Sequence, residues 1–321
     1  MHAAAINLRG GVSPRGTLLR GQSIIEYVLI IAIIGLVIVF AGPGVAGAIR
    51  NQFNQVTNTM NSGTNGGTEG GGASGGGSAG ADSATVQAAV AKDPKDWTLD
   101  EQKAVAEDIA AKGEASPVYA KAKAAMDAMT KWSVNLANGK TMKYHIIGIN
   151  HDDLADGSGK AGLTFAVYDY SMGNQRMNST DTNVGGWEKS ELRGRLNSGD
   201  IWALLPAEVQ SKAKAVTKMT DNQGGGKAGT PTATTDKVFL LSVTEVYGDD
   251  QSDGTQYEYY KSKGVTGSNW SGASSSFHHW TRSVFQGNSA CYRHVRGDGY
   301  GFDGNNDGAR NTYYVCPAWC F

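Results

Sequence analysis

The sequence predicts an α+β protein with a long N-terminal transmembrane helix, a flexible linker, a short helical neck and an α+β C-terminal domain. Three observations support this organisation. Residues 27–49 carry no charge, residues 61–83 are rich in Gly and Ser without a large apolar residue, and the segment after Trp132 has the spacing of strands and turns. We therefore place the leader, apolar helix, linker, neck and C-terminal domain at residues 1–21, 22–60, 61–83, 84–131 and 132–321.

The overall composition excludes few partners. The chain has 321 residues, a formal net charge of −1 and a pI near 6.6, so no basic field indicates binding to nucleic acid. The three cysteines, Cys291, Cys316 and Cys320, lie near the C-terminal end. An odd number allows one disulfide with a spare thiol, or no disulfide, and does not support a disulfide framework.

The N-terminal apolar segment follows a basic leader that ends at Gly21. At about 1.5 Å rise per residue, residues 27–49 are long enough to cross a hydrocarbon core of about 30 Å. An ordinary secretory signal has its cleavage site after the apolar stretch, whereas the small residue here lies before it. Cleavage after Gly21 would therefore keep the helix on the mature protein. Glu26 lies at the start of this helix, where a carboxylate costs about 2.5 kcal/mol or more in lipid and so needs a partner.

This arrangement resembles the prepilin signal of Flp-type (type IVb) pilins, in which a peptidase cuts after the glycine. The resemblance implies cleavage between Gly21 and Gln22, and roles in pilus assembly for Glu26 and Tyr27, with Glu26 facing the new amino group of a neighbouring subunit. It also implies three kinds of partner: a prepilin peptidase, other pilin subunits and the membrane. The protein would reside in the inner or cytoplasmic membrane before assembly, and then at the cell surface or in a pilus with its C-terminal domain outside. A plain signal-anchor helix is the alternative.

The next two segments have simple compositions. Residues 61–83 predict a flexible tether with an average span of about 25–30 Å. Residues 84–131 predict short amphipathic helices, one of which starts after Thr98 with Glu101 three residues on, the signature of a capping box. We expect these helices to form a neck that packs on the following domain; a partner-binding bundle is the alternative.

In the C-terminal domain, apolar runs predict strands at residues 142–149, 163–168 and 237–243, and residues 209–219 include a further strand candidate. Residues 187–205 predict helix with a break at 197–200.

The same domain resembles an uncharacterised domain common in surface proteins of gut-type bacteria, which is similar to the C-type-lectin-like fold. That fold is shared by formylglycine-generating enzymes and by the variable proteins of diversity-generating retroelements. The resemblance is carried by Gly186-Trp187 with Leu192-Arg193 and Leu196-Asn197, by the run 235–242, by 280–283 and by the terminal 315–318. The sequence departs from the pattern at Cys316 and at Val284, where such proteins more often have a small or basic residue and a proline.

In the variable proteins, residues just before the terminal tail line an exposed, diversified binding face. Residues 285–314 have the same palette of Tyr, Arg, Asn, Asp, Ser, His and Gly, which combines rigid amphipathic contacts with adaptable hydrogen bonds. We therefore expect a ligand-binding face, which the resemblance implies to be hypervariable; an ordinary polar loop is the alternative. The ligand would be a host, bacterial or phage surface protein or glycan. Its predicted contacts are Phe285, Tyr292, His294, Arg296, Tyr300, Phe302, Asp303, Asn305, Asn306, Asp307, Arg310, Asn311 and Tyr313.

Other chemistry has weaker support in the sequence. Residues 303–308 match the opening of a calcium loop, but the twelfth position is Tyr314 instead of a bidentate Glu. This excludes an EF-hand, and the alternative is a weaker Ca²⁺ site formed by other oxygen ligands. His278 and His279 would point to opposite faces of a strand and could not bind one metal together. The resemblance assigns structural roles to Trp280 and Arg282, as core filler and as a donor that braces loops.

These patterns together predict a non-enzymatic, pilin-like surface adhesin whose lectin-like domain binds a ligand. One alternative is a surface-tethered oxidase of the formylglycine-generating type, which would use Cys316 and Cys320 as paired cysteines on copper. Another is a purely structural pilin subunit.

Overall fold

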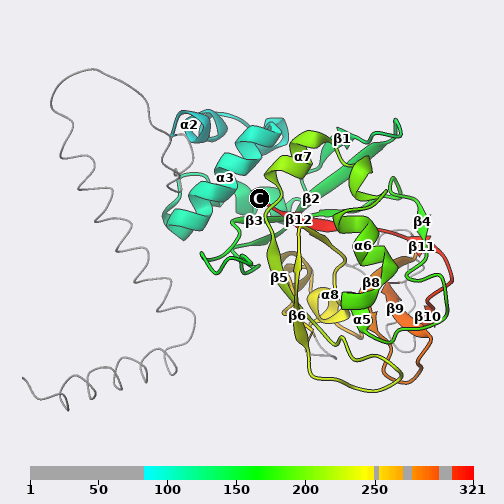
Figure 1. The fold of residues 1–321 in the computed structure, drawn as a ribbon. Coiled ribbons are helices and arrows are strands. Elements are labelled where there is room, and N and C mark those ends of the chain that lie inside the picture. The colour runs from blue at the N-terminus through cyan, green and yellow to red at the C-terminus, as the bar shows by residue number, and fades with distance from the viewer. Residues whose placement is uncertain (1–82, 249–252, 270–276, 296–305) are drawn as a thin grey trace, which may run out of the picture. The chain divides into compact units, whose positions relative to one another are not determined.

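The computed structural model describes residues 83–248, 253–269, 277–295 and 306–321 (Figure 1). All of them belong to one compact unit, Gly70–Phe321. The leader, apolar helix and linker predicted over residues 1–83 lie outside the described residues, apart from Ser83.

The prediction of a long N-terminal transmembrane helix is not supported, and the described residues form an α+β fold. Among the described residues, no helix is both long and apolar enough to cross a membrane. The longest of them, α3 (Leu99–Lys112), has 14 residues and a length of about 21 Å, which is shorter than a hydrocarbon core of about 30 Å. The segment 22–60, to which the prediction referred, is not part of the described chain.

The helical neck consists of α2 (Ser83–Ala91), α3 and α4 (Tyr119–Asp127), with 3-10 turns at Pro94–Asp96 and Gly113–Ala115. The predicted capping box of α3 is confirmed, because the Thr98 hydroxyl accepts from Glu101 N and the Glu101 carboxylate accepts from Thr98 N. Capping satisfies amide groups that have no partner within the first turn.

The neck and the C-terminal domain share one hydrophobic core. Trp97, which precedes α3, stacks on Trp132 with ring centroids 6.4 Å apart. The Trp132 indole donates to Pro94 O at 2.9 Å, so the two segments are joined by packing and by a hydrogen bond.

The first five-stranded sheet has the order β1-β2-β3-β12-β7 and is antiparallel throughout. Its strands are β1 (Trp132–Asn135), β2 (Thr141–Ile149), β3 (Leu163–Val167), β12 (Ala318–Cys320) and β7 (Val238–Phe239). The strands predicted at 142–149 and 163–168 are therefore confirmed.

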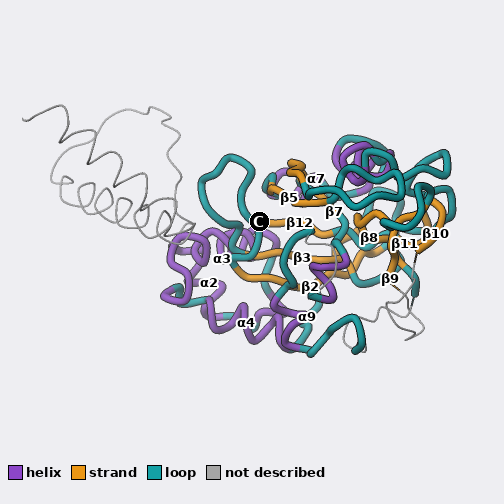
Figure 2. The backbone as a smooth tube through the Cα atoms, turned by 90° about the horizontal axis from the view of Figure 1, so that it is seen from below, coloured by secondary structure: helices purple, strands orange, loops and turns teal. Residues whose placement is uncertain are grey.

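The second five-stranded sheet has the order β10-β9-β8-β11-β4, in which only β11 and β8 pair in parallel. Its strands are β10 (Asn306–Gly308), β9 (Cys291–Val295), β8 (His279–Val284), β11 (Tyr313–Tyr314) and β4 (Asn174–Gln175). A separate hairpin joins β5 (Val216–Thr220) and β6 (Thr232–Asp236). Strands β8 to β10 lie at the opposite end of the domain from α2 and α3 (Figures 1 and 2).

Short helices connect the strands: α5 (Gly186–Lys189), α6 (Glu191–Asn197), a 3-10 turn at Trp202–Leu204, α7 (Ala207–Lys212), α8 (Val243–Tyr247) and α9 (Glu258–Ser262). The helical prediction for 187–205 is confirmed.

The segment 209–219 includes a strand as predicted, since its end forms β5 after the last part of α7. The strand prediction for 237–243 is partly wrong. In the run 237–243 only Val238 and Phe239 are strand, because Ser242 caps α8 in a capping box with Glu245. Ser242 with Glu245 three residues later is the sequence signal of a helix start, but the apolar run before it favoured a strand.

Candidate ligand-binding site

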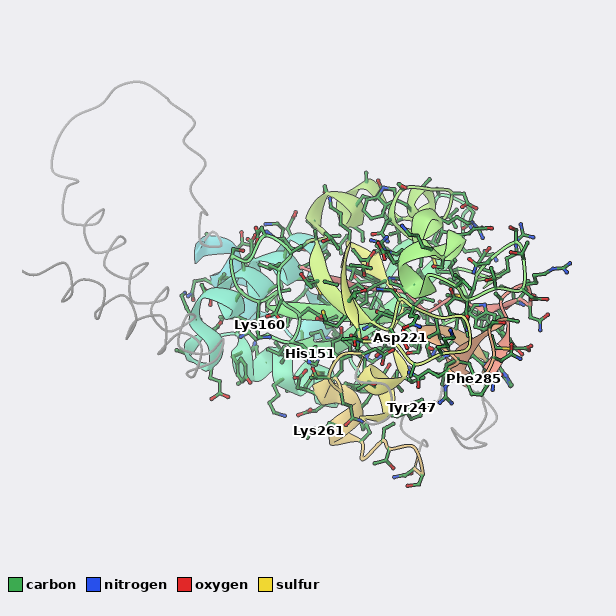
Figure 3. All side chains as sticks on the ribbon, turned by 60° about the horizontal axis from the view of Figure 1, so that its bottom comes forward. His151, Lys160, Asp221, Tyr247, Lys261 and Phe285 are labelled. Carbon is green, nitrogen blue, oxygen red and sulfur yellow. The ribbon has the colours of Figure 1, made fainter. Side chains whose placement is uncertain are left out.

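A cavity of about 800 Å³ is lined by residues of both five-stranded sheets and of helices α8 and α9. Its volume lies in the range of about 300–1,000 Å³ that is typical of small-ligand sites. In Figure 3, Tyr247 marks the end of α8 and Lys261 marks α9. Its polar and aromatic lining residues include Lys131, Lys140, Lys143, His145, Tyr168, Asp169, Tyr170, Ser171, Tyr259, Tyr260, Phe277, His279, Trp280 and Cys316.

Strand β2 forms one wall of the cavity. Its side chains alternate between two faces, so one set packs in the core and the other lines the cavity. Tyr144 belongs to the core face, where its hydroxyl donates to Gln102 Oε1 in α3 at 3.1 Å. Lys143 and His145 belong to the other face and line the cavity. Ala166, which lies directly opposite His145 in β3, lines the cavity as well.

His145 is buried in this wall, 3% exposed. Its Nδ1 lies 3.0 Å from Ile146 O, and its ring meets Tyr259 edge-on with centroids 4.7 Å apart. Burial lowers the pKa of His145 to about 4, because an imidazolium would lose its hydration there. The side chain is therefore neutral at pH 7.

The loop after β3 places a buried hydroxyl against the cavity. Asp169 fixes this loop, since its carboxylate accepts from Lys143 N at 2.8 Å and from Ser171 N at 3.0 Å. Ser171 is 6% exposed and lines the cavity, and its Oγ has no hydrogen-bond partner among the described residues. A buried hydroxyl without a partner costs free energy, and a ligand group in the cavity could supply that partner.

Aromatic side chains continue the cavity wall towards the second sheet. Tyr170 is 64% exposed and meets Phe277 edge-on at a centroid distance of 5.9 Å. Phe277 also packs against Tyr314 at 4.9 Å. Phe277 lines a second cavity of about 400 Å³, whose other lining residues are Asn174, His278, Thr312, Tyr313 and Tyr314. The two cavities therefore adjoin at one aromatic cluster.

The same face of the first sheet carries a buried ionic network next to the cavity wall. Thr164, two residues before Ala166 in β3, donates to Asp152 Oδ2 at 2.6 Å. Lys218 Nζ lies 2.6 Å from Asp152 Oδ1 and 2.5 Å from Glu245 Oε1. Burial alone would raise the pKa of Asp152, but Lys218 holds it below its ordinary value.

Arg282 joins this network to the surrounding loops. It makes a bidentate pair with Glu245, with Nη2 to Oε1 at 2.9 Å, and donates to the carbonyl oxygens of Leu240 and Asp253 at 3.0 Å. Trp280 is also fully packed, at 1% exposed. The predicted structural roles of Trp280 as core filler and Arg282 as a donor that braces loops are confirmed.

Five of the predicted ligand contacts lie outside the described residues, so the structure does not place them: Arg296, Tyr300, Phe302, Asp303 and Asn305. Arg310 and Asn311 are exposed. Phe285, Asn306, Asp307 and Tyr313 are half-buried, and Tyr292 and His294 are buried.

The structure brings His294, Asp307 and Tyr313 together. The rings of His294 and Tyr313 stack with centroids 4.6 Å apart, and the Tyr313 hydroxyl donates to Asp307 Oδ2 at 2.5 Å. Tyr313 lines the smaller cavity, so this group borders the aromatic cluster described above.

Two predicted contacts lie elsewhere. Tyr292 is fully buried, and its hydroxyl donates to Gly186 O at 2.9 Å, so it joins β9 to α5 instead of lying on an exposed face. Phe285 lies beside the C-terminal strands (Figure 3), where the Arg293 guanidinium is 5.3 Å from its ring centroid.

The residues considered for metal chemistry are separated. His279 lines the larger cavity and His278 the smaller, which confirms that they face different sides of the chain. The Asp307 carboxylate accepts from Gly308 N, Asn311 and Tyr313, so protein donors already satisfy this member of the proposed calcium loop. Within the described part of the chain, no three His, Cys, Asp or Glu side chains are grouped to hold a metal ion.

The cysteines are free and buried. Cys316 lines the larger cavity, whereas Cys320 Sγ lies 3.4 Å from Asp152 Oδ2 in the ionic network. Burial raises the pKa of both thiols, which keeps them protonated and weakly nucleophilic.

Residues 161–320 match the model of a family described as a domain of unknown function, DUF6273. The chain is similar to that family over just under half of its length. The residues on which the resemblance to an uncharacterised surface-protein domain was based all fall inside the matched region. No curated protein and no solved structure matches the chain.

Sequence reasoning placed the site in the C-terminal segment and missed the cavity wall formed by β2, the loop after β3 and α9. The signal in β2 was present: Lys143 and His145 alternate with the apolar Met142, Tyr144 and Ile146. This alternation places Lys143 and His145 together on the face of β2 opposite the apolar core face.

Proposed function

We propose that the C-terminal domain is a ligand-binding domain of a surface-displayed, pilin-like adhesin, and that its ligand enters the cavity of about 800 Å³. The observation that carries the proposal is this cavity itself, with aromatic walls and the unpartnered hydroxyl of Ser171. Concave sites that combine apolar walls with a few placed polar groups are typical of ligand binding.

The position of the cavity also supports the proposal. It adjoins the smaller cavity at Phe277, and Tyr313 of the predicted ligand face lines that smaller cavity. One ligand could thus contact both the cavity and the segment 306–313. Surface display is supported by the sequence alone, through the resemblance of Gly21-Gln22 to a prepilin cleavage site.

The rival oxidase has less support. Its mechanism requires a pair of cysteines that act together, but Cys316 and Cys320 have different surroundings, and burial raises the pKa of both thiols. A purely structural subunit would not require a cavity with aromatic walls.

Binding of the chain to a glycan and protein array tests the proposal, with Thr141→Trp as the blocking variant. Thr141 is exposed on β2 and lines the cavity, so an indole there would obstruct it. Thr235→Trp is the matched control, because Thr235 is an exposed strand threonine of β6 that does not line the cavity. Loss of binding only in Thr141→Trp supports the proposal; equal binding by both variants would overturn it.

A second variant tests the predicted face. If binding survives the combined change of Tyr300, Phe302 and Arg310 to Ala but not Thr141→Trp, the cavity binds the ligand without those residues. Loss of binding in both variants would place the ligand across the cavity and the C-terminal segment.

A further inference from the structure

The charges around the larger cavity are predominantly positive. Lys131, Lys140 and Lys143 line it, and all three residues are exposed. Asp169 is the one acidic residue among its described lining residues, and both oxygens of that carboxylate already accept backbone N–H groups. The cavity therefore favours an anion over a cation.

The three lysines belong to the hairpin of β1 and β2, and all of them line the same cavity. Lys131 precedes β1, Lys140 precedes β2, and Lys143 lies in β2 opposite Ser133 of β1. Lys131 reaches the aromatic wall, since its Nζ lies 4.6 Å from the ring centroid of Tyr168.

The walls below these lysines suit a ring-shaped ligand with hydroxyl groups. Tyr168 and Tyr260 line the cavity and are half-buried, so part of each side chain stays accessible, whereas Tyr259 and Trp280 line it but are 6% and 1% exposed. Amphipathic rings of this kind pack on apolar ring faces while their polar ends form hydrogen bonds. Ser171 Oγ, buried and without a partner, supplies one more hydrogen-bonding group at a fixed position.

We propose that this cavity binds an acidic saccharide, with its negative group at Lys131, Lys140 and Lys143 and its sugar ring against Tyr168 and Tyr260. The inference rests on the proposed function and specifies the ligand class for the same site. Lysine ammonium groups act as point charges, so both a carboxylate and a sulfate could provide the negative charge.

Calorimetric titration of the full chain with three disaccharides of matched size tests the inference: a uronic acid disaccharide, a sulfated one and a neutral one. We expect binding of at least one acidic disaccharide, weakening with added salt, and little binding of the neutral sugar. Preference between the uronic acid and the sulfated probe then identifies the source of the charge.

The variant Lys131→Gln/Lys140→Gln/Lys143→Gln should weaken binding about tenfold or more, since each exposed charge contributes modestly and the three add. The control Lys95→Gln/Lys123→Gln/Lys189→Gln removes the same charge from three exposed lysines outside the cavity, and should change affinity less than about twofold. Ser171→Ala should weaken binding of the saccharide without changing its salt dependence.

Equal binding of the neutral and acidic sugars, or equal loss in the two triple variants, would overturn the acidic-saccharide assignment. A fourth probe, an aromatic carboxylate that is not a sugar, would also overturn the assignment if it bound more tightly than all three disaccharides. These results differ from a failure of the proposed function, because Thr141→Trp would still abolish binding of whichever ligand occupies the cavity.

Discussion

Arg282 and Glu245 form a bidentate ion pair in the interior of the domain, with side chains 0% and 2% exposed. Burial alone would raise the pKa of Glu245, but Arg282 and Lys218 hold it below its ordinary value. Asp253 lies beside the pair, and its pKa is raised because burial outweighs the attraction of Arg282. Lys218 extends the network, because its Nζ lies within ion-pair distance of both Asp152 and Glu245.

Arg282→Met should therefore lower the free energy of unfolding by about 3–5 kcal/mol, because it leaves Glu245 buried with only part of its compensation. Arg195→Met is the matched control: Arg195 also pairs with a carboxylate, that of Asp200, but the two side chains are 30% and 67% exposed. Its cost should be about 0–1 kcal/mol. Urea unfolding measures both, and similar losses in the two variants would contradict a structural role specific to the buried pair.

A second prediction concerns the packing of the neck on the domain. A Cβ at Gly162 would lie 1.8 Å from Ala106 O in α3, so Gly162→Ala must push α3 away from β3. We expect a loss of about 1–3 kcal/mol, the usual cost of overpacking, and more if the helix cannot shift. Gly194→Ala is the control, because nothing lies within 4 Å of a Cβ at that position in α6.

Replacement of Gly194 by Ala within a helix should raise stability by about 0.5–1 kcal/mol. Thermal unfolding of the two variants should therefore move in opposite directions. A Gly162→Ala variant as stable as the wild type would show that the close contact between α3 and β3 is absent in solution.

A third prediction concerns processing of the N-terminus. If the prepilin resemblance is correct, mass spectrometry of the mature protein from producing cells should find an N-terminal peptide that begins at Gln22. Gly21→Arg should prevent this cleavage, because a long charged side chain replaces the small residue before the cut. Mature wild-type protein that retains Met1 would contradict the resemblance.

Local signals made much of the fold predictable. The apolar runs around Tyr144 and Phe165 predicted β2 and β3, and the Thr98–Glu101 spacing predicted the start of α3. These signals depend on neighbours in the sequence. The strand prediction for 237–243 was partly wrong because one apolar run contains both the short strand β7 and the start of α8. The strand and the helix are separated by tertiary packing near Ser242.

The site was less predictable for a physical reason. Its wall joins His145, Ser171, Tyr259 and Trp280, which are far apart in the sequence and meet only through the pairing of strands in two sheets. Composition could identify a polar, aromatic C-terminal segment but not that Tyr292 within it is buried. Which members of such a segment reach a ligand depends on the register of β9 and on its contact with Gly186.

The final prediction uses His145 as a reporter of the cavity wall. Its pKa is lowered from 6.5 to about 4 in the folded protein. Between these two pH values the unfolded chain binds a proton that the folded protein does not, so stability rises with pH from about 4 to 6.5, by up to about 1.4 kcal/mol per pH unit from this group. Above pH 6.5 the contribution of His145 to the free energy of unfolding no longer changes with pH.

His145→Phe should remove this part of the slope, which is seen as a smaller difference between unfolding free energies measured at pH 4.5 and 6.5 (both within the window of about 4 to 6.5 set by the two pKa values). An NMR titration of the His145 ring measures the pKa directly, and a midpoint near 6.5 would contradict burial of a neutral imidazole. Burial lowers the pKa of His279, the other histidine that lines the cavity, to about 4 as well. Because both histidines are neutral throughout the physiological range, the positive charge at the cavity comes from its lysines. Binding of an acidic saccharide should then be nearly independent of pH between about 6 and 8, where neither lysine nor carboxylate titrates.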